Sequence, residues 1–120
     1  MINGLLSSSW KKRAQTLERL YRNYPDRPDL TLPLLIACLW DQEPTVRGLA
    51  ELYLLRTPRQ LIVAYLKDLL ASKDPQIRFH AIQIAEFICS PFLLPILNPD
   101  IETEPRLRNK IKNLRNKVAL

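Results

Sequence analysis

Apolar side chains recur at intervals of three and four residues along most of the 120-residue chain, the spacing of one face of an α-helix. The stripes are clear in 46–54, 62–70, 77–88 and 107–118. Ten residues are proline, whereas Gly4 and Gly48 are the only glycines. Helices accept proline in their first turn, while sheets usually need glycine in tight turns. The pattern therefore predicts an all-α protein.

A five-residue motif occurs three times in the sequence. It reads Glu-Pro-Thr-Val-Arg at 43–47, Asp-Pro-Gln-Ile-Arg at 74–78 and Glu-Pro-Arg-Leu-Arg at 104–108, at spacings of 31 and 30 residues. The acid stands where it can cap a helix, the proline suits the first helical position, and the aliphatic residue begins the apolar stripe. We expect Asp74 to cap better than Glu43 or Glu104.

A second helix fits between successive motifs. Thr57-Pro58 resembles another helix start, and Ser90-Pro91 opens a shorter apolar segment that further prolines interrupt. A degenerate first copy over 10–21, capped by Ser8 or Ser9, precedes the apolar segment 30–40. The sequence thus predicts a single domain, 1–120, folded as a short α-solenoid of about three helical hairpins plus a closing C-terminal helix. Its repeats start near residues 8, 43, 74 and 104.

Helical hairpins of about 30 residues that open with acid-Pro-x-aliphatic-Arg resemble HEAT repeats. The resemblance is closest to the short bacterial HEAT-like repeats that also occur in phycobilin lyases. It implies a curved stack with a binding surface and a ladder of acid–arginine pairs, here formed by Asp74, Arg47, Arg78 and Arg108. Gly48 departs from a good helix interior, and close approach of another helix is one explanation for it.

The positive charge is concentrated at the end of the chain. The net charge is +6, and residues 1–104 carry equal numbers of acids and bases. The last helix has no acid and six cations, which are Arg106, Arg108, Lys110, Lys112, Arg115 and Lys117. One interpretation is the polar cap of a solenoid. The other is a binding element for an acidic protein, nucleic acid or an anionic membrane, of which the membrane is disfavoured because the apolar face lacks Trp and Phe.

The sequence contains no recognisable catalytic constellation. His80 is the only histidine, no metal-ligand spacing or glycine-rich phosphate loop is present, and the acid pairs before the motif helices are explained by capping. Cys38 and Cys89 lie in apolar runs and are expected to be buried, reduced thiols. With no signal peptide and no apolar stretch of about 18–20 residues, we expect a cytoplasmic protein that is neither an enzyme nor dependent on a cofactor.

These observations favour a protein-binding, scaffold or adaptor module whose partner is another protein with an acidic surface. The candidate binding residues on the motif helices are Arg47, Glu51, Arg78 and Glu86, joined by the six cations of the last helix. The first alternative is a nucleic-acid-binding protein that uses the basic helix 105–120. The second, suggested by the lyase resemblance alone, is a subunit of a tetrapyrrole-handling complex. A homo-oligomer formed through exposed solenoid ends is a further option.

Overall fold

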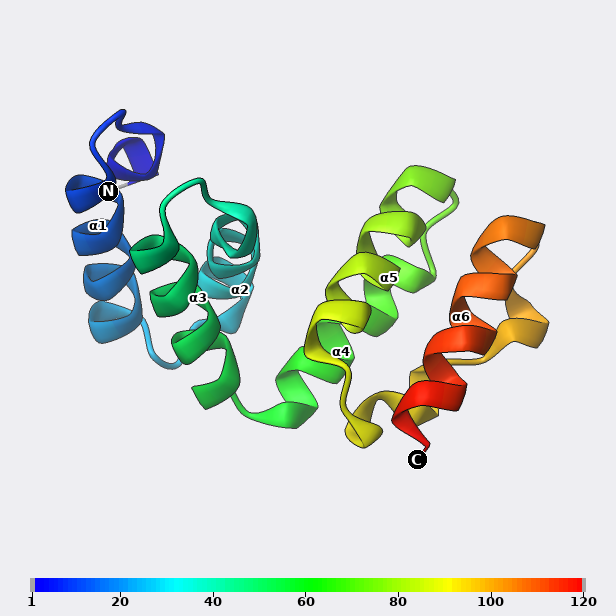
Figure 1. Cartoon of the computed structure of the whole chain (residues 1–120). Helices are drawn as coiled ribbons and strands as arrows, with labels where there is room; N and C mark the ends of the chain where they lie inside the picture. The colour runs from blue at the N-terminus through cyan, green and yellow to red at the C-terminus, as the bar shows by residue number, and fades with distance from the viewer. Residues whose placement is uncertain (1, 120) are drawn as a thin grey trace. The chain divides into compact units, whose positions relative to one another are not determined.

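The computed structural model describes residues 2–119, which form helices and no strand, so the predicted all-α class is confirmed (Figure 1). The α-helices are α1 (Trp10–Asn23), α2 (Pro28–Ala37), α3 (Pro44–Arg56), α4 (Arg59–Leu70), α5 (Pro75–Ile88) and α6 (Pro105–Val118). A short 3-10 helix, η1 (Ile2–Leu6), precedes α1. Three more lie in two of the connections: η2 (Cys38–Trp40) between α2 and α3, and η3 (Pro91–Ile96) and η4 (Pro99–Ile101) between α5 and α6.

The chain divides into two compact units, Met1–Pro58 and Arg59–Leu120. We call them the N-terminal and C-terminal units and describe each by itself. The prediction that 1–120 forms one domain stays a prediction.

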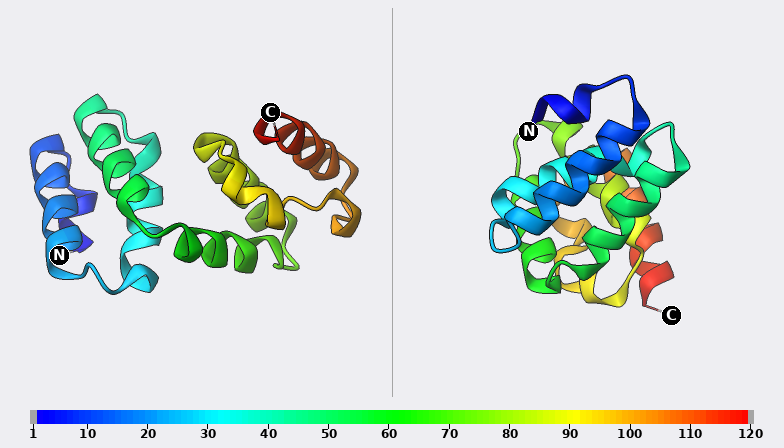
Figure 2. Two further views of the ribbon diagram at one scale, coloured as in Figure 1. Left: turned by 90° about the horizontal axis from the view of Figure 1, so that it is seen from below. Right: turned by 90° about the vertical axis from the view of Figure 1, so that its left-hand side faces the viewer.

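In the N-terminal unit, α1 lies beside α3, and α2 packs against both (Figure 2). Leu17, Leu35 and Leu54 are almost completely buried at the centre of the unit. The rings of Tyr21 on α1 and Tyr53 on α3 stack, with centroids 4.4 Å apart. Burial of these apolar faces is the main source of stability for such short helices.

In the C-terminal unit, α5 lies between α4 and α6, and α5 and α6 run in the same direction (Figure 1). Leu66, Ile82 and Ile84 are buried in its core. As the sequence suggested, the segment after Pro91 is too short for a full helix, and the 3-10 helix η3 contains Pro95. Leu93 and Leu97 nevertheless anchor this segment in the core.

The helix starts predicted at the three motif prolines agree with the structure. Pro44, Pro75 and Pro105 are the first residues of α3, α5 and α6. The Asp74 carboxylate accepts a hydrogen bond of 2.9 Å from the Gln76 N–H, whereas Glu43 and Glu104 make no side-chain cap. Asp74 is therefore the best of the three caps, as expected.

The two cysteines have different environments. Cys38 is buried as expected, but Cys89 is exposed, and both are free thiols. The prediction for Cys89 was wrong because this residue ends α5 in the left-handed conformation, with φ of 45°. That conformation takes the side chain off the apolar face of the helix.

Replacing Gly48 with alanine should stabilise the protein by about 0.5–1 kcal/mol. Outside its own helix backbone, a Cβ atom at Gly48 would meet no described atom of the N-terminal unit within 4 Å, so close approach of another helix of this unit does not explain the glycine. Alanine therefore fits without a clash and restricts the unfolded chain. Urea unfolding followed by circular dichroism measures the change, and an unchanged or lower midpoint would contradict it.

Candidate functional site

The four helices that follow the repeat starts, α1, α3, α5 and α6, are each preceded by the same hydrogen-bonded turn. In each turn, the side-chain oxygen of the residue three positions before the helix is the acceptor. It accepts a hydrogen bond from the backbone N–H of the residue two positions later. The pairs are Ser7 with Ser9 (3.1 Å), Asp41 with Glu43 (2.9 Å), Ser72 with Asp74 (3.1 Å) and Glu102 with Glu104 (3.0 Å). We call these turns the opening loops.

An arginine in the first turn of each of these helices holds its own opening loop. It donates a hydrogen bond to the backbone carbonyl of the residue three positions before the helix, the same residue whose side chain accepts the N–H. The bonds are Arg13 to Ser7 (2.8 Å), Arg47 to Asp41 (2.7 Å), Arg78 to Ser72 (3.0 Å) and Arg108 to Glu102 (2.8 Å). The motif arginine thus fixes the start of its helix in all four copies, including the first, where Trp10 replaces the proline.

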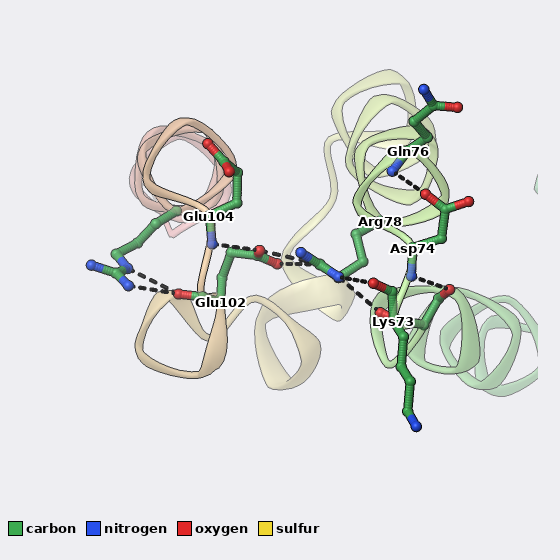
Figure 3. A network of polar contacts seen from close by, with 8 residues as sticks. Lys73, Asp74, Gln76, Arg78, Glu102 and Glu104 are labelled. Atoms are coloured by element: carbon green, nitrogen blue, oxygen red, sulfur yellow. Dashed lines mark hydrogen bonds and ion pairs between the residues drawn. The ribbon is translucent and has the colours of Figure 1, made fainter.

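Two of the arginines also bind the carboxylate of the next opening loop. Arg13 donates from Nε and Nη2 to the two oxygens of Asp41, at 2.8 and 2.9 Å. Arg78 donates from Nε to both oxygens of Glu102, at 3.0 and 3.1 Å (Figure 3). The paired side chains are largely shielded, with Glu102 only 4% exposed. Charge-assisted bonds of this kind are among the stronger ones in proteins, so each pair ties two motif helices together within one unit.

The acids that pair with the arginines are not the acid that the resemblance implied. The resemblance implied that Asp74 would pair with a ladder arginine, but the Asp74 carboxylate caps α5 instead (Figure 3). The ladder acids are Asp41 and Glu102, two residues before the motif acids Glu43 and Glu104. The repeated acid-x-Glu-Pro sequence was the available signal, although capping had seemed sufficient to explain it.

The pairing with Arg13 changes the titration of Asp41. The hydrogen bond from the Arg13 guanidinium lowers the pKa of the Asp41 carboxyl from its usual value, and this outweighs the opposing effect of burial. The same carboxylate accepts the Glu43 N–H, which also favours its charged form.

The two motif helices of each unit differ in the type of residue at one equivalent position. Seven residues after the helix start, α1 has Leu17 and α5 has Ile82, and both side chains are fully buried. The equivalent residues on α3 and α6 are Glu51 and Lys112, which are exposed. Each unit therefore ends with a motif helix that presents a charged residue at this position.

Five of the six cations of α6 fall into two groups, and Lys112 belongs to neither. Leu107, Ile111, Leu114 and Val118 form the buried stripe, with cations on both sides of it. On one side, Arg108 donates to the Glu102 carbonyl and Arg115 to the Leu97 carbonyl, at 2.7 Å for Arg115. These two arginines hold the 3-10 segments against α6, so their charge is partly used within the unit.

On the other side, Arg106, Lys110 and Lys117 line hollows between α5 and α6. We call these three residues the cation row. The larger hollow, about 420 Å³, includes Phe79, whose ring centroid lies 5.5 Å from Lys110 Nζ. The smaller one, about 170 Å³, includes Glu86 and the Cys89 thiol. Lys112 is exposed and borders neither hollow.

The structure brings together only part of the predicted binding set. Glu86 lies 4.0 Å from Lys110, and both side chains are about half exposed. Arg78 is shielded and serves the ladder, so it offers little surface to a partner. Arg47 and Glu51 are exposed on α3, in the N-terminal unit.

Comparisons with known proteins give no identification. No family model matches the chain, and no curated protein or solved structure is detectably similar to it. Among residues 2–119, no helix is long and apolar enough to cross a membrane. The same residues contain no group of three or more His, Cys, Asp or Glu side chains placed to hold a metal ion.

Proposed function

We propose that this chain is a non-catalytic, HEAT-like protein-binding module of the cytoplasm. Its C-terminal unit binds an acidic segment of a partner protein along the cation row. The observation that supports this proposal is the division of the α6 cations, since two are engaged with backbone carbonyls while Arg106, Lys110 and Lys117 line hollows on one side.

The shape and charge of this surface suit an extended peptide. Arg106 and Lys117 are eleven residues apart, which corresponds to about 16 Å along an α-helix. Phe79, which is half-buried, provides apolar contact beside the charges. Lys110 already has the Glu86 carboxylate at 4.0 Å, so carboxylates of a partner would pair chiefly with Arg106 and Lys117.

One feature of the hollows beside the cation row favours an acidic protein over nucleic acid. The one aromatic side chain there, Phe79, is half-buried and already lies beneath Lys110, so it is a poor platform for base stacking.

Reversing one charge of the cation row should weaken partner binding about tenfold, whereas the matched reversal outside it should have little effect. The variants are Lys117→Glu in the row and Lys112→Glu on the same helix but away from the hollows. Both lysines are exposed and the charge change is identical. Binding is measured by pull-down from the source cell after nuclease treatment, followed by titration of the partner recovered.

Equal losses from the two variants would contradict a localised site and indicate only a general effect of charge. Loss of every partner after nuclease treatment would favour the nucleic-acid alternative. Retention of the partner by Lys117→Glu with undiminished affinity would place the binding surface elsewhere.

A further inference from the structure

Arg47 makes the same bonds to its own opening loop as the ladder arginine Arg78. Arg78 Nη1 donates to two successive carbonyls, those of Ser72 and Lys73, at 3.0 and 3.2 Å. Arg47 Nη1 donates to the corresponding pair, Asp41 and Gln42, at 2.7 and 3.2 Å. The guanidinium of Arg47 is therefore held in place by its own loop, as that of Arg78 is.

The remaining guanidinium donors distinguish Arg47 from the two ladder arginines, Arg13 and Arg78. Arg78 uses Nε for the Glu102 carboxylate, and Arg13 uses Nε and Nη2 for Asp41. At Arg47, no described residue of the N-terminal unit accepts a hydrogen bond from Nε or Nη2. The Arg47 side chain is exposed.

We infer that Arg47 is a preorganised receptor for a carboxylate at the start of a helix in another polypeptide. The chemistry follows from the two filled copies. In each, the bound carboxylate belongs to an acid-x-Glu-Pro sequence and also accepts the N–H two residues later in its own loop. A planar guanidinium already fixed by backbone carbonyls loses little freedom when it binds such a group.

The carboxylate is assigned to another polypeptide because this chain has none left at the equivalent loop position. Of its four opening loops, two provide the acids Asp41 and Glu102, which Arg13 and Arg78 already bind. The other two provide Ser7 and Ser72, whose hydroxyl groups accept the N–H bonds of their own turns.

The surroundings of Arg47 suit a helix start. On α3, Leu55 is 64% exposed and lies eight residues after Arg47, about 12 Å along the helix, where it offers apolar contact to a later turn of a docked helix. The exposed Glu51 lies one turn after Arg47 and would favour a cation in the first turn of that helix. An acid-x-Glu-Pro sequence followed by basic and aliphatic residues meets these requirements.

The test uses the full chain and a synthetic peptide with the sequence of residues 100–113, which carries Glu102 in its acid-x-Glu-Pro context. The matched peptide has glutamine in place of Glu102. Nuclear magnetic resonance of arginine Nε–H groups follows binding directly at Arg47, with the peptide raised to about 2 mM because a single site of this size binds weakly.

We expect the peptide to shift the Arg47 Nε–H signal and the glutamine peptide to bind about tenfold more weakly. Arg47→Gln should weaken binding by a similar factor. Arg56→Gln, which changes another exposed arginine of α3, should not. No shift of the Arg47 signal, equal binding of both peptides, or equal losses from the two variants would overturn the inference.

This site does not depend on the proposed function. Lys117→Glu alters the cation row in the C-terminal unit and should bind the peptide as the unmodified chain does. Failure of the cation-row test would therefore leave the Arg47 result intact, and the reverse also holds.

Discussion

Glu102→Ala is expected to lower the free energy of unfolding of the C-terminal unit by about 3–5 kcal/mol. The substitution removes the carboxylate that binds Arg78 and accepts the Glu104 N–H. Arg78 is only 12% exposed, so its charge would be left without its ion-pair partner in a shielded place. Urea unfolding followed by circular dichroism gives the loss.

Glu86→Ala is the matched control, because Glu86 belongs to the same unit and makes an exposed pair with Lys110 at 4.0 Å. Its effect should stay within about 0.5 kcal/mol. The loss of stability caused by Glu102→Ala is attributed to the unpaired charge of Arg78. If so, the double variant with Arg78→Met should lose about 1 kcal/mol or more less unfolding free energy than the sum of the two single losses. Additive losses, or a loss no larger than that of Glu86→Ala, would contradict the role of the pair.

Asp41→Asn should destabilise the N-terminal unit by about 2 kcal/mol at neutral pH, because it weakens the charge-assisted bonds from Arg13. Trp10 and Trp40 are the only tryptophans of the chain, and both lie in this unit, so their fluorescence reports its unfolding. Asp26→Asn, a change at an exposed aspartate of the same unit, is the control and should have little effect.

The effect of Asp41→Asn should depend on pH in a defined direction. Because the pKa of Asp41 is lowered in the folded protein, its stabilisation is fully present above the unfolded value of about 3.9. The stabilisation is lost as the pH falls through the lower pKa of the folded state. The difference in unfolding free energy between the unmodified protein and Asp41→Asn should therefore become smaller as the pH falls from 5 to 2. A difference that stays constant would contradict the stabilising role of the Asp41 carboxylate.

The helix starts could be predicted from the sequence because their determinants are local. A proline at the first position and an acid before it act within one turn of chain, and α3, α5 and α6 begin where these residues predict. The apolar stripes identified most of the buried faces, for example Leu107 and Ile111 on α6, but Ile77, expected to begin the stripe of α5, is 39% exposed.

The ladder acids were harder to predict because their partners are distant in sequence. Asp41 lies 28 residues from Arg13, and Glu102 lies 24 residues from Arg78. Capping accounted for both acids locally, and only the packing of neighbouring helices shows that they bind arginines.

The two groups of α6 cations could not be told apart from the sequence for a similar reason. The sequence shows six equivalent cations. Arg108 repeats the opening-loop contact of the other motif arginines, whereas the Leu97 carbonyl that engages Arg115 belongs to a loop residue with no recognisable pattern. Which side of α6 faces α5 depends on tertiary packing. The exposure of Cys89 was missed for a related reason, since a left-handed residue other than glycine at a helix end is uncommon.

The exposed Cys89 gives the protein a natural attachment point for a chemical probe. Its thiol borders the smaller hollow together with Lys110 and Lys117, while the other cysteine, Cys38, is buried. A thiol-reactive fluorophore would therefore label the edge of the cation row selectively without any mutation. Its emission would report in real time whether a partner occupies that surface.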